Sequence, residues 1–460
     1  MDRGAVYLAT TTQVAGLYPW VLGSGLPPEG VPIGPDLLTH ELVCVDPAGW
    51  VGSLVTNPGV WVMGQPGVGK SAVVKRISIV YSAYGYRVVV PGDVKGEYTS
   101  LVEALGGQVV RIGRGLDKLN PLDSGPLRAR LPGLGPERRE ALMAEINGRR
   151  SELLHALITT DAGLGRRPGA AEAHVVQQAM RVVAAQLLGE DPVIPDIVKV
   201  LREGPAELRT ALMVDSEDDY RDQVREITLG LENLCSGPLS GLFDGPTSKP
   251  LDLAAPALSV DLSTLLTSGH TVVSAGLLAT WAYAYASIDS ARAVGAMDQP
   301  LVLPLDEMWR ALRAGPGMVS AFDAMTRLNR AKGELTVFLT HSLDDLKALP
   351  TPEDRAKAAG MMDRCDTVIL GALAKGELER VSSQRPLTQA EIDLVSSWSS
   401  STHSGVDGAE QRHPGRGRVL IKIGTRPGTP AQLQLTDAEA DMFNTDAAIK
   451  RATHHAGERS

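Results

Sequence analysis

The sequence has few aromatic residues and few cysteines. Phe, Trp and Tyr together make up 4% of its 460 residues, so it offers few platforms on which the bases of a single strand can stack. The three cysteines, Cys44, Cys235 and Cys365, are far apart along the chain. This spacing contains no CxxC zinc pair, and sparse thiols are typical of a reducing compartment.

The sequence also lacks a clear targeting or membrane segment. The N-terminus shows no basic region followed by an apolar one, so we predict no signal peptide. The most apolar stretch, residues 271–287, is short for a membrane span and contains polar residues. We interpret it as a buried helix of a cytoplasmic protein. The formal net charge of −9 argues against a broad electrostatic coating of DNA, although it permits a local basic patch.

Residues 64–71 form a complete GxxxxGK[ST] phosphate loop. An apolar run at 60–63 predicts the strand before it, and residues 72–77 predict the helix after it. In such a loop the backbone amides surround phosphate, Lys70 reaches the β- and γ-phosphates and Ser71 holds Mg²⁺. The candidate ATP-contacting residues here are Gly64, Gln65, Pro66, Gly67, Val68, Gly69, Lys70, Ser71 and Ala72.

A second candidate element is the apolar run 301–305, followed directly by Asp306 and Glu307. We expect Asp306 to hold Mg²⁺ opposite Ser71, and Glu307 to polarise the attacking water. A pair of surface acids at a strand end is the alternative. Pro304 is unusual inside a strand and indicates a bulge or an edge.

Three further groups are candidates for the same site. The strand predicted at 335–340 ends before His341, which we expect to sense the γ-phosphate. Arg327 and Arg330 are the candidates for an arginine that enters a neighbouring subunit's site, with Arg416 and Arg418 as competitors. Glu97, in the acid pair of residues 93–98, would orient water or link subunits, although an ordinary loop is the simpler interpretation.

The chain alternates between strand and helix patterns in two separate regions. We predict a short cap at 1–50, a discontinuous α/β core at 51–125 and 236–450, an all-helical insertion at 126–235 and a disordered tail at 451–460. Within the core we expect a loop and helix at 93–105, a helix at 317–331 and an exposed loop at 383–417. A hairpin of strands 418–423 and 431–435, followed by a helix at 436–450, would end it.

Taken in order, these strings resemble the conjugation ATPases of type IV secretion, within the FtsK–HerA superfamily of hexameric motors. The phosphate loop is generic. The other matching strings are residues 93–98 followed by 119–122, 237–245, 305–309, 340–341 and 420–428. The more discriminating ones are 93–98 with 119–122, 237–245 and 420–428. His341 departs from the pattern, because the family tends to carry Gln there.

The resemblance implies a RecA-like P-loop core with a mostly parallel sheet, ATP and Mg²⁺ as ligands, and sites lying between the subunits of a hexameric ring. It also implies attachment to a membrane-embedded transfer complex at the inner face of the membrane, with DNA or protein as the moved substrate. Two alternatives stay open at this point. One is an FtsK- or HerA-like translocase on double-stranded DNA, and the other is a nucleotide-binding assembly subunit with little turnover.

Overall fold

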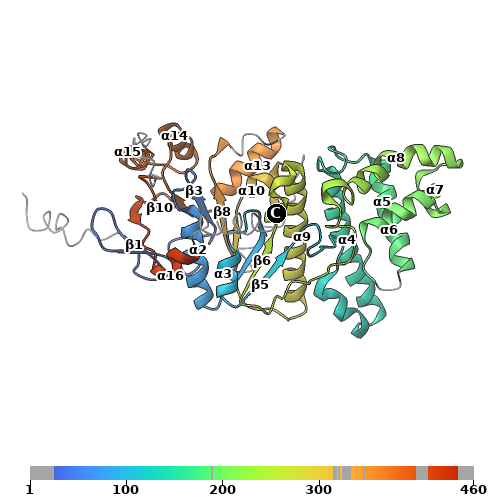
Figure 1. The fold of residues 1–460 in the computed structure, drawn as a ribbon, viewed down its shortest axis with the longest axis horizontal. Coiled ribbons are helices and arrows are strands. Elements are labelled where there is room, and N and C mark those ends of the chain that lie inside the picture. Colours follow the sequence, from blue (N-terminus) through green and yellow to red (C-terminus); the bar gives the residue numbers. More distant parts are fainter. Residues whose placement is uncertain are drawn as a thin grey trace, which may run out of the picture.

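The computed structural model describes residues 25–187, 190–313, 319, 322–323, 333–344, 349, 351–399 and 413–443. Its centre is a nine-stranded sheet with the order β11-β10-β9-β3-β8-β7-β4-β6-β5 (Figure 1). The strands from β9 to β5 are parallel, and β10 and β11 are antiparallel additions at one edge. The strands are β3 (Val60–Met63), β4 (Arg87–Asp93), β5 (Gln108–Arg111), β6 (Ala257–Asp261), β7 (Leu301–Leu305), β8 (Leu335–Thr340), β9 (Thr367–Leu370), β10 (Arg418–Ile423) and β11 (Thr429–Gln432).

Both faces of the sheet are buried, because its side chains alternate between two hydrophobic clusters. In β3, Val60 and Val62 pack with residues of helix α2 (Lys70–Ala83), whereas Trp61 and Met63 belong to the cluster on the other face, with helix α9 (His270–Ala293). This alternation follows from the two-residue period of a strand. It explains why the strands read as continuous apolar runs, as expected for a parallel sheet covered on both faces.

Helix α9 is a core helix that lies against β4 and separates the sheet from the insertion (Figure 1). It is long and apolar enough to cross a membrane, but 83% of its most apolar window is buried inside the protein. In the described parts of the chain it is the only helix with that length and composition. The expectation of a buried helix at 271–287 is therefore confirmed.

Residues between β5 and β6 form the helical insertion, which extends away from the sheet (Figure 1). Its helices are α4 (Pro136–Thr159), α5 (Ala170–Gln186), α6 (Ile194–Glu203), α7 (Ala206–Leu212) and α8 (Glu217–Asn233). The segments that enter and leave it are joined, since the amide of Leu119 donates to the carbonyl of Leu242 at 3.0 Å and Lys118 Nζ lies 2.9 Å from Asp244 Oδ1. Two of the strings behind the family resemblance thus meet at the base of the insertion, where their role is structural. The exact boundaries of the units stay a prediction.

Smaller elements complete the chain. Strands β1 (Val31–Pro35) and β2 (Leu42–Val45) form a separate two-stranded sheet beside β11. The short helices α3 and α10 lie next to the sheet. Helices α13 to α16 belong to the C-terminal part of the chain, after β8. Their bounds are α3 (Thr99–Ala104), α10 (Met308–Leu312), α13 (Pro352–Asp363), α14 (Lys375–Gln384), α15 (Gln389–Ser397) and α16 (Asp437–Met442).

Two local predictions need correction. The predicted loop at 383–417 contains helix α15, because Thr388 and Glu391 form a reciprocal capping box at its N-terminus. The loop and helix expected at 93–105 are confirmed, because the Asp93 carboxylate accepts the amides of Glu97 and Tyr98 and folds the first residues into a turn, and α3 begins at Thr99. The last strand is Thr429–Gln432 rather than 431–435. Most of the helix predicted at 317–331, apart from residues 319 and 322–323, and residues 444–450 of the last helix lie outside the described residues.

Pro304 lies in a central strand, so it marks neither an edge nor a bulge in β7. The carbonyl of Pro300 accepts from the amide of Arg87 in β4, and alternate residues of a strand point to the same neighbour. The nitrogen of Pro304 therefore points toward β4. The β7–β4 ladder ends at the pair Val88–Val302, so the missing N–H of Pro304 removes no ladder hydrogen bond.

Candidate active site

The phosphate loop connects β3 to α2, as the sequence predicts. Gly67 and Gly69 have φ values of 79° and 102°, which non-glycine residues rarely adopt. A Cβ on Gly64 would lie 2.9 Å from Val68 Cγ2, so this glycine lets the loop close on itself. Helix α2 begins at Lys70, and its first amides are the usual donors to a phosphate anion.

Lys70 is buried and folded back onto its own loop. Its Nζ donates to the carbonyls of Gly64 at 2.7 Å and Gln65 at 3.0 Å, and it lies 2.9 Å from His341 Nδ1. Burial lowers the pKa of Lys70 to about 8, although the nearby Asp306 carboxylate opposes this shift and Lys95 adds to it. The Lys70 ammonium is thus held by acceptors of the protein, which a bound phosphate would replace.

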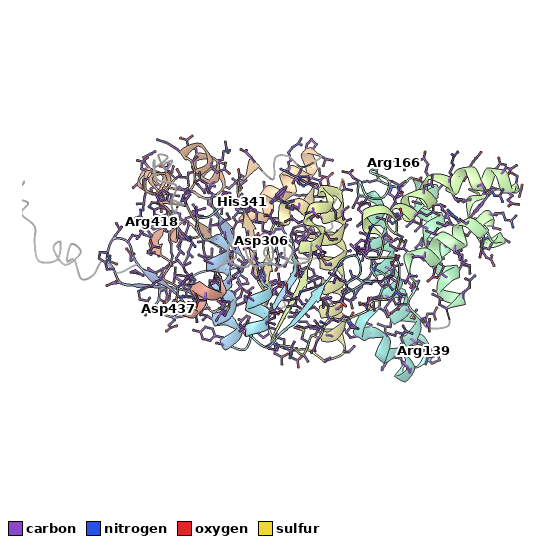
Figure 2. All side chains as sticks on the ribbon, in the orientation of Figure 1. Arg139, Arg166, Asp306, His341, Arg418 and Asp437 are labelled. Atoms are coloured by element: carbon purple, nitrogen blue, oxygen red, sulfur yellow. The ribbon has the colours of Figure 1, made fainter. Side chains whose placement is uncertain are left out.

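The order of the strands brings the acids and His341 next to this loop. Strand β8 pairs with β3 on one side and with β7 on the other, all in parallel, so their carboxyl ends share one edge of the sheet. Residues 64, 306 and 341 directly follow these three strands. In Figure 2, Asp306 and His341 lie in the middle of the core, far from Arg139 and Arg166 on the insertion.

Glu307 is enclosed by three nitrogen-bearing side chains. Its Oε1 lies 2.6 Å from Lys95 Nζ and 3.6 Å from His341 Nε2, and its Oε2 lies 3.0 Å from Arg310 Nε. The residue has the left-handed backbone φ of 52°, which is uncommon for a non-glycine residue and typical of functional positions. Burial by itself would raise the pKa of Glu307, but the contacts with His341, Lys95 and Arg310 hold it well below its usual range.

His341 links the two halves of the site. A charged lysine has only donors, so Nδ1 of His341 accepts from Lys70 and Nε2 carries the proton that faces Glu307. A neutral imidazole thus connects the phosphate-loop lysine with the candidate catalytic acid. This position is consistent with the predicted sensing role, which stays a prediction.

Asp306 differs from its neighbour Glu307. Burial raises the pKa of Asp306 to about 6, while the charge of Lys95 opposes the shift. Its Oδ1 accepts the amide of Glu307 at 2.8 Å, which fixes the turn after β7. A cation at this position would compensate the buried charge, as Mg²⁺ does when it is held between a carboxylate and a phosphate-loop hydroxyl.

The turn after β4 places further charges around the site. Burial raises the pKa of Asp93 to about 7, against the effect of the amides of Tyr98 and Glu97. The Glu97 carboxylate lies 3.9 Å from the buried Nζ of Lys75, which follows Ser71 by one helical turn. Glu97 is therefore paired within its own chain, and its role in orienting water or linking subunits stays a prediction.

The C-terminal segment 413–417 lies on the phosphate loop. His413 Nε2 is 3.1 Å from Gln65 Oε1, and the amide of Gly417 donates to the carbonyl of Val68 at 2.8 Å. Arg416 and Arg418 are exposed beside it, and Figure 2 shows Arg418 on the core. Of the four candidate arginines, Arg327 and Arg330 lie outside the described residues.

The sequence predictions missed two groups at this site. Lys95 and Arg310 were not predicted as partners of Glu307, although Lys95 lies in the distinctive string 93–98. Arg310 follows Glu307 by three residues, a spacing at which residues of a helix meet. These signals exist in the sequence, but only the pairing of strands shows that both cations lie on one carboxylate.

The residues present fit a magnesium–nucleoside triphosphate. A Cβ on Gly67 would meet nothing within 4 Å, and one on Gly69 would meet only the backbone of Gly417 at 3.6 Å, so no side chain lies at either position. Lys70, Ser71, Asp306 and Glu307 supply the cation, hydroxyl and carboxylates that this chemistry requires. Among the described residues, no group of three or more Asp, Glu, His or Cys side chains could bind a metal alone, so Mg²⁺ would need oxygen ligands from the nucleotide or water.

Comparisons with known proteins support the same fold. No protein-family model and no curated protein sequence matches the chain. VirB4 of Thermoanaerobacter pseudethanolicus superimposes with a TM-score of 0.69 and 19% identity, over 90% of this chain and 99% of that one. The plasmid coupling protein TrwB matches with TM-scores of 0.52 in complex with ADP and Mg²⁺ and 0.51 with the ATP analogue ADPNP, at 12% and 13% identity, over 82% of this chain and 86% of TrwB. The fold implied by the motif strings is confirmed: this chain has the α/β, RecA-like P-loop architecture of VirB4 and TrwB.

Proposed function

We propose that this chain is an ATP-hydrolysing motor of a conjugative transfer or type IV secretion apparatus. The observation that carries the proposal is the convergence of Lys70, Asp306, Glu307 and His341 at the ends of three adjacent parallel strands. This convergence occurs in a fold shared with VirB4 and with a coupling protein solved with ADP, Mg²⁺ and ADPNP.

Each residue has a role that follows from its position. The loop amides and Lys70 bind the phosphates, and Lys70 leaves the Gly64 and Gln65 carbonyls to do so. Ser71 and Asp306 hold Mg²⁺, which neutralises charge on the phosphates when it is bound. Glu307 accepts the proton of the attacking water. His341 senses whether Lys70 is bound to a phosphate, because it contacts both Lys70 and Glu307.

The assembly is the less direct part of the proposal. We infer a hexameric ring in which an arginine of one subunit completes the next subunit's site, with Arg327, Arg330, Arg416 and Arg418 as candidates. Arg416 and Arg418 are exposed at the phosphate loop, as such a role requires. We place the ring on the cytoplasmic face of a membrane-embedded transfer complex, with DNA or protein as the substrate.

The proposal predicts Mg²⁺-dependent ATPase activity that depends on Lys70 and Glu307. Lys70→Ala should abolish nucleotide binding and hydrolysis. Glu307→Gln should retain binding and lower the hydrolysis rate about 10²- to 10⁴-fold, the usual contribution of a general base. The measurements are phosphate release and calorimetric binding of ADPNP, with the insertion variant Lys199→Met as a control. Full activity in both site variants would refute the proposal.

Duplex DNA distinguishes the motor from a DNA translocase. A translocase that tracks phosphates should show an ATPase rate that rises with duplex DNA and falls steeply with salt. We expect little response, because the net charge of the chain is −9. Particle images with ADPNP would show whether a ring forms. Ring formation with bound nucleotide but no hydrolysis would instead indicate the assembly subunit.

A further inference from the structure

Glu307 is closed off from water by the residues around it. Its side chain is only 3% exposed, and the nearest of its three nitrogen partners is Lys95 Nζ at 2.6 Å. A water molecule that reacts with a phosphate must first reach this carboxylate. The arrangement described here therefore cannot activate water until at least one of the partners moves.

Of the two charged partners, Lys95 is better able to move than Arg310. The Asp93 carboxylate fixes the backbone of its turn by accepting the amides of Glu97 and Tyr98, and Gly96 has a positive φ of 68°. The long side chain of Lys95 is 35% exposed and can pivot from this fixed base. Arg310, in contrast, is 18% exposed, and its guanidinium lies 4.8 Å from the centre of the Trp309 ring, within its own short helix.

Lys95 also lies close to the phosphate loop, because it shares Glu307 Oε1 with His341, whose Nδ1 lies 2.9 Å from Lys70 Nζ. Its positive charge acts on Lys70 and on Asp306, the two groups expected to meet the phosphates and Mg²⁺. Two ammonium groups near one another repel, and an added anion between them relieves that repulsion. A terminal phosphate would thus compete with Glu307 for Lys95.

We propose that Lys95 senses the terminal phosphate: it holds Glu307 when no triphosphate is bound, and it pairs with the phosphate and uncovers Glu307 when one is. The inference rests on the proposed ATP site and adds a positioning residue to it. Glu307 would then be accessible to water only while a triphosphate is present. A diphosphate lacks the terminal phosphate, so Lys95 stays paired with Glu307.

Binding measurements test this without relying on turnover. ADPNP and ADP are titrated calorimetrically into the wild type, Lys95→Met, Glu307→Gln and the control Lys118→Met. Lys118 is also a partly exposed lysine, paired with Asp244 at 2.9 Å at the base of the insertion. Lys95→Met should lower the affinity for ADPNP at least about tenfold, which corresponds to the loss of one charge-assisted hydrogen bond. It should change the affinity for ADP by less than about twofold.

The other variants sharpen the test. Glu307→Gln should tighten ADPNP binding, because Lys95 no longer has to leave a carboxylate. Lys95→Arg should retain most of the ADPNP affinity that Lys95→Met loses. Lys118→Met should change the affinity for neither ligand. Circular dichroism would show that each variant is folded.

Two outcomes overturn the inference while leaving the proposed function intact. An equal loss of ADPNP and ADP affinity in Lys95→Met would mean that Lys95 only maintains the shape of the site. Unchanged or tighter ADPNP binding would mean that it only covers Glu307. A wild-type protein that binds neither nucleotide would refute the proposed function itself, and the inference with it.

Discussion

The α/β core and the helical insertion bury different kinds of side chain. In the described part of the insertion the buried charged residue is Arg150, which pairs with Asp191 at the base. The core buries many more: Arg76, Glu391, Lys422 and Glu439 form ion pairs near its C-terminal half, and Lys70, Lys75, Asp93, Asp261 and Glu307 lie at the carboxyl ends of its parallel strands or next to them. Buried charge is costly unless it is paired, so the group at the strand ends indicates a site whose chemistry requires it. The insertion, by contrast, is stabilised mainly by apolar helix packing.

The largest effect should come from breaking a buried ion pair of the core. Lys422 in β10 binds both oxygens of Glu391 in α15, at 2.9 and 3.0 Å, and both side chains are almost fully buried. Lys422→Met should lower the free energy of unfolding by about 3–5 kcal/mol, because it leaves a buried carboxylate unpaired. Urea denaturation measures the change.

The matched control for this variant lies on the insertion. The pair of Lys199 and Glu203 is exposed and 3.9 Å apart, so Lys199→Met should cost less than about 1 kcal/mol. Equal losses in the two variants would contradict the contrast between buried and exposed charge.

A smaller, purely apolar effect is expected in the insertion. Leu231 in α8 is fully buried, so Leu231→Ala should cost about 2–5 kcal/mol of stability. Leu229, two residues earlier, is 50% exposed, and Leu229→Ala should change stability by less than about 0.5 kcal/mol. Neither variant should alter the affinity for ADPNP, measured under conditions in which the variant is fully folded. A loss of affinity in Leu231→Ala would show that the two regions are coupled.

The effect that is smallest for each measured step, at about 1.4 kcal/mol per pH unit, is the pH dependence of stability. The pKa of Asp93 is raised to about 7 in the folded protein and is about 3.9 in an unfolded chain. The folded state therefore binds the proton more tightly, and this group's stabilising contribution is complete below about pH 4 and lost as the pH rises to about 7. Asp93→Asn should remove a decline of about 1.4 kcal/mol per pH unit within that window.

Denaturation curves at pH 5, 6 and 7 measure this slope. The exposed Asp298 serves as the control, and Asp298→Asn should keep the wild-type slope. If Asp93→Asn also keeps it, Asp93 is ionised in the folded protein and the description of its buried turn is wrong.

Local elements were predictable where a short stretch of sequence carries its own backbone signal. The helix after the phosphate loop and the strand before it lie where predicted. Helix α15 was missed, although the capping pair Thr388 and Glu391 is visible in the sequence, because the Ser-rich composition around it favoured a loop. The loop and helix at 93–105 were predicted, and the structure adds that one carboxylate, Asp93, holds the turn that precedes the helix.

The sequence by itself determined the phosphate cradle, because eight consecutive residues supply the glycines, the lysine and the serine that a helix N-terminus needs to bind phosphate. It also placed an acid pair at a strand end. Only the tertiary structure decided that Lys70, His341, Glu307 and Lys95 form one connected set. Their contacts depend on the order of β3, β8, β7 and β4 in the sheet, and strand order is a property of long-range packing that no local pattern contains.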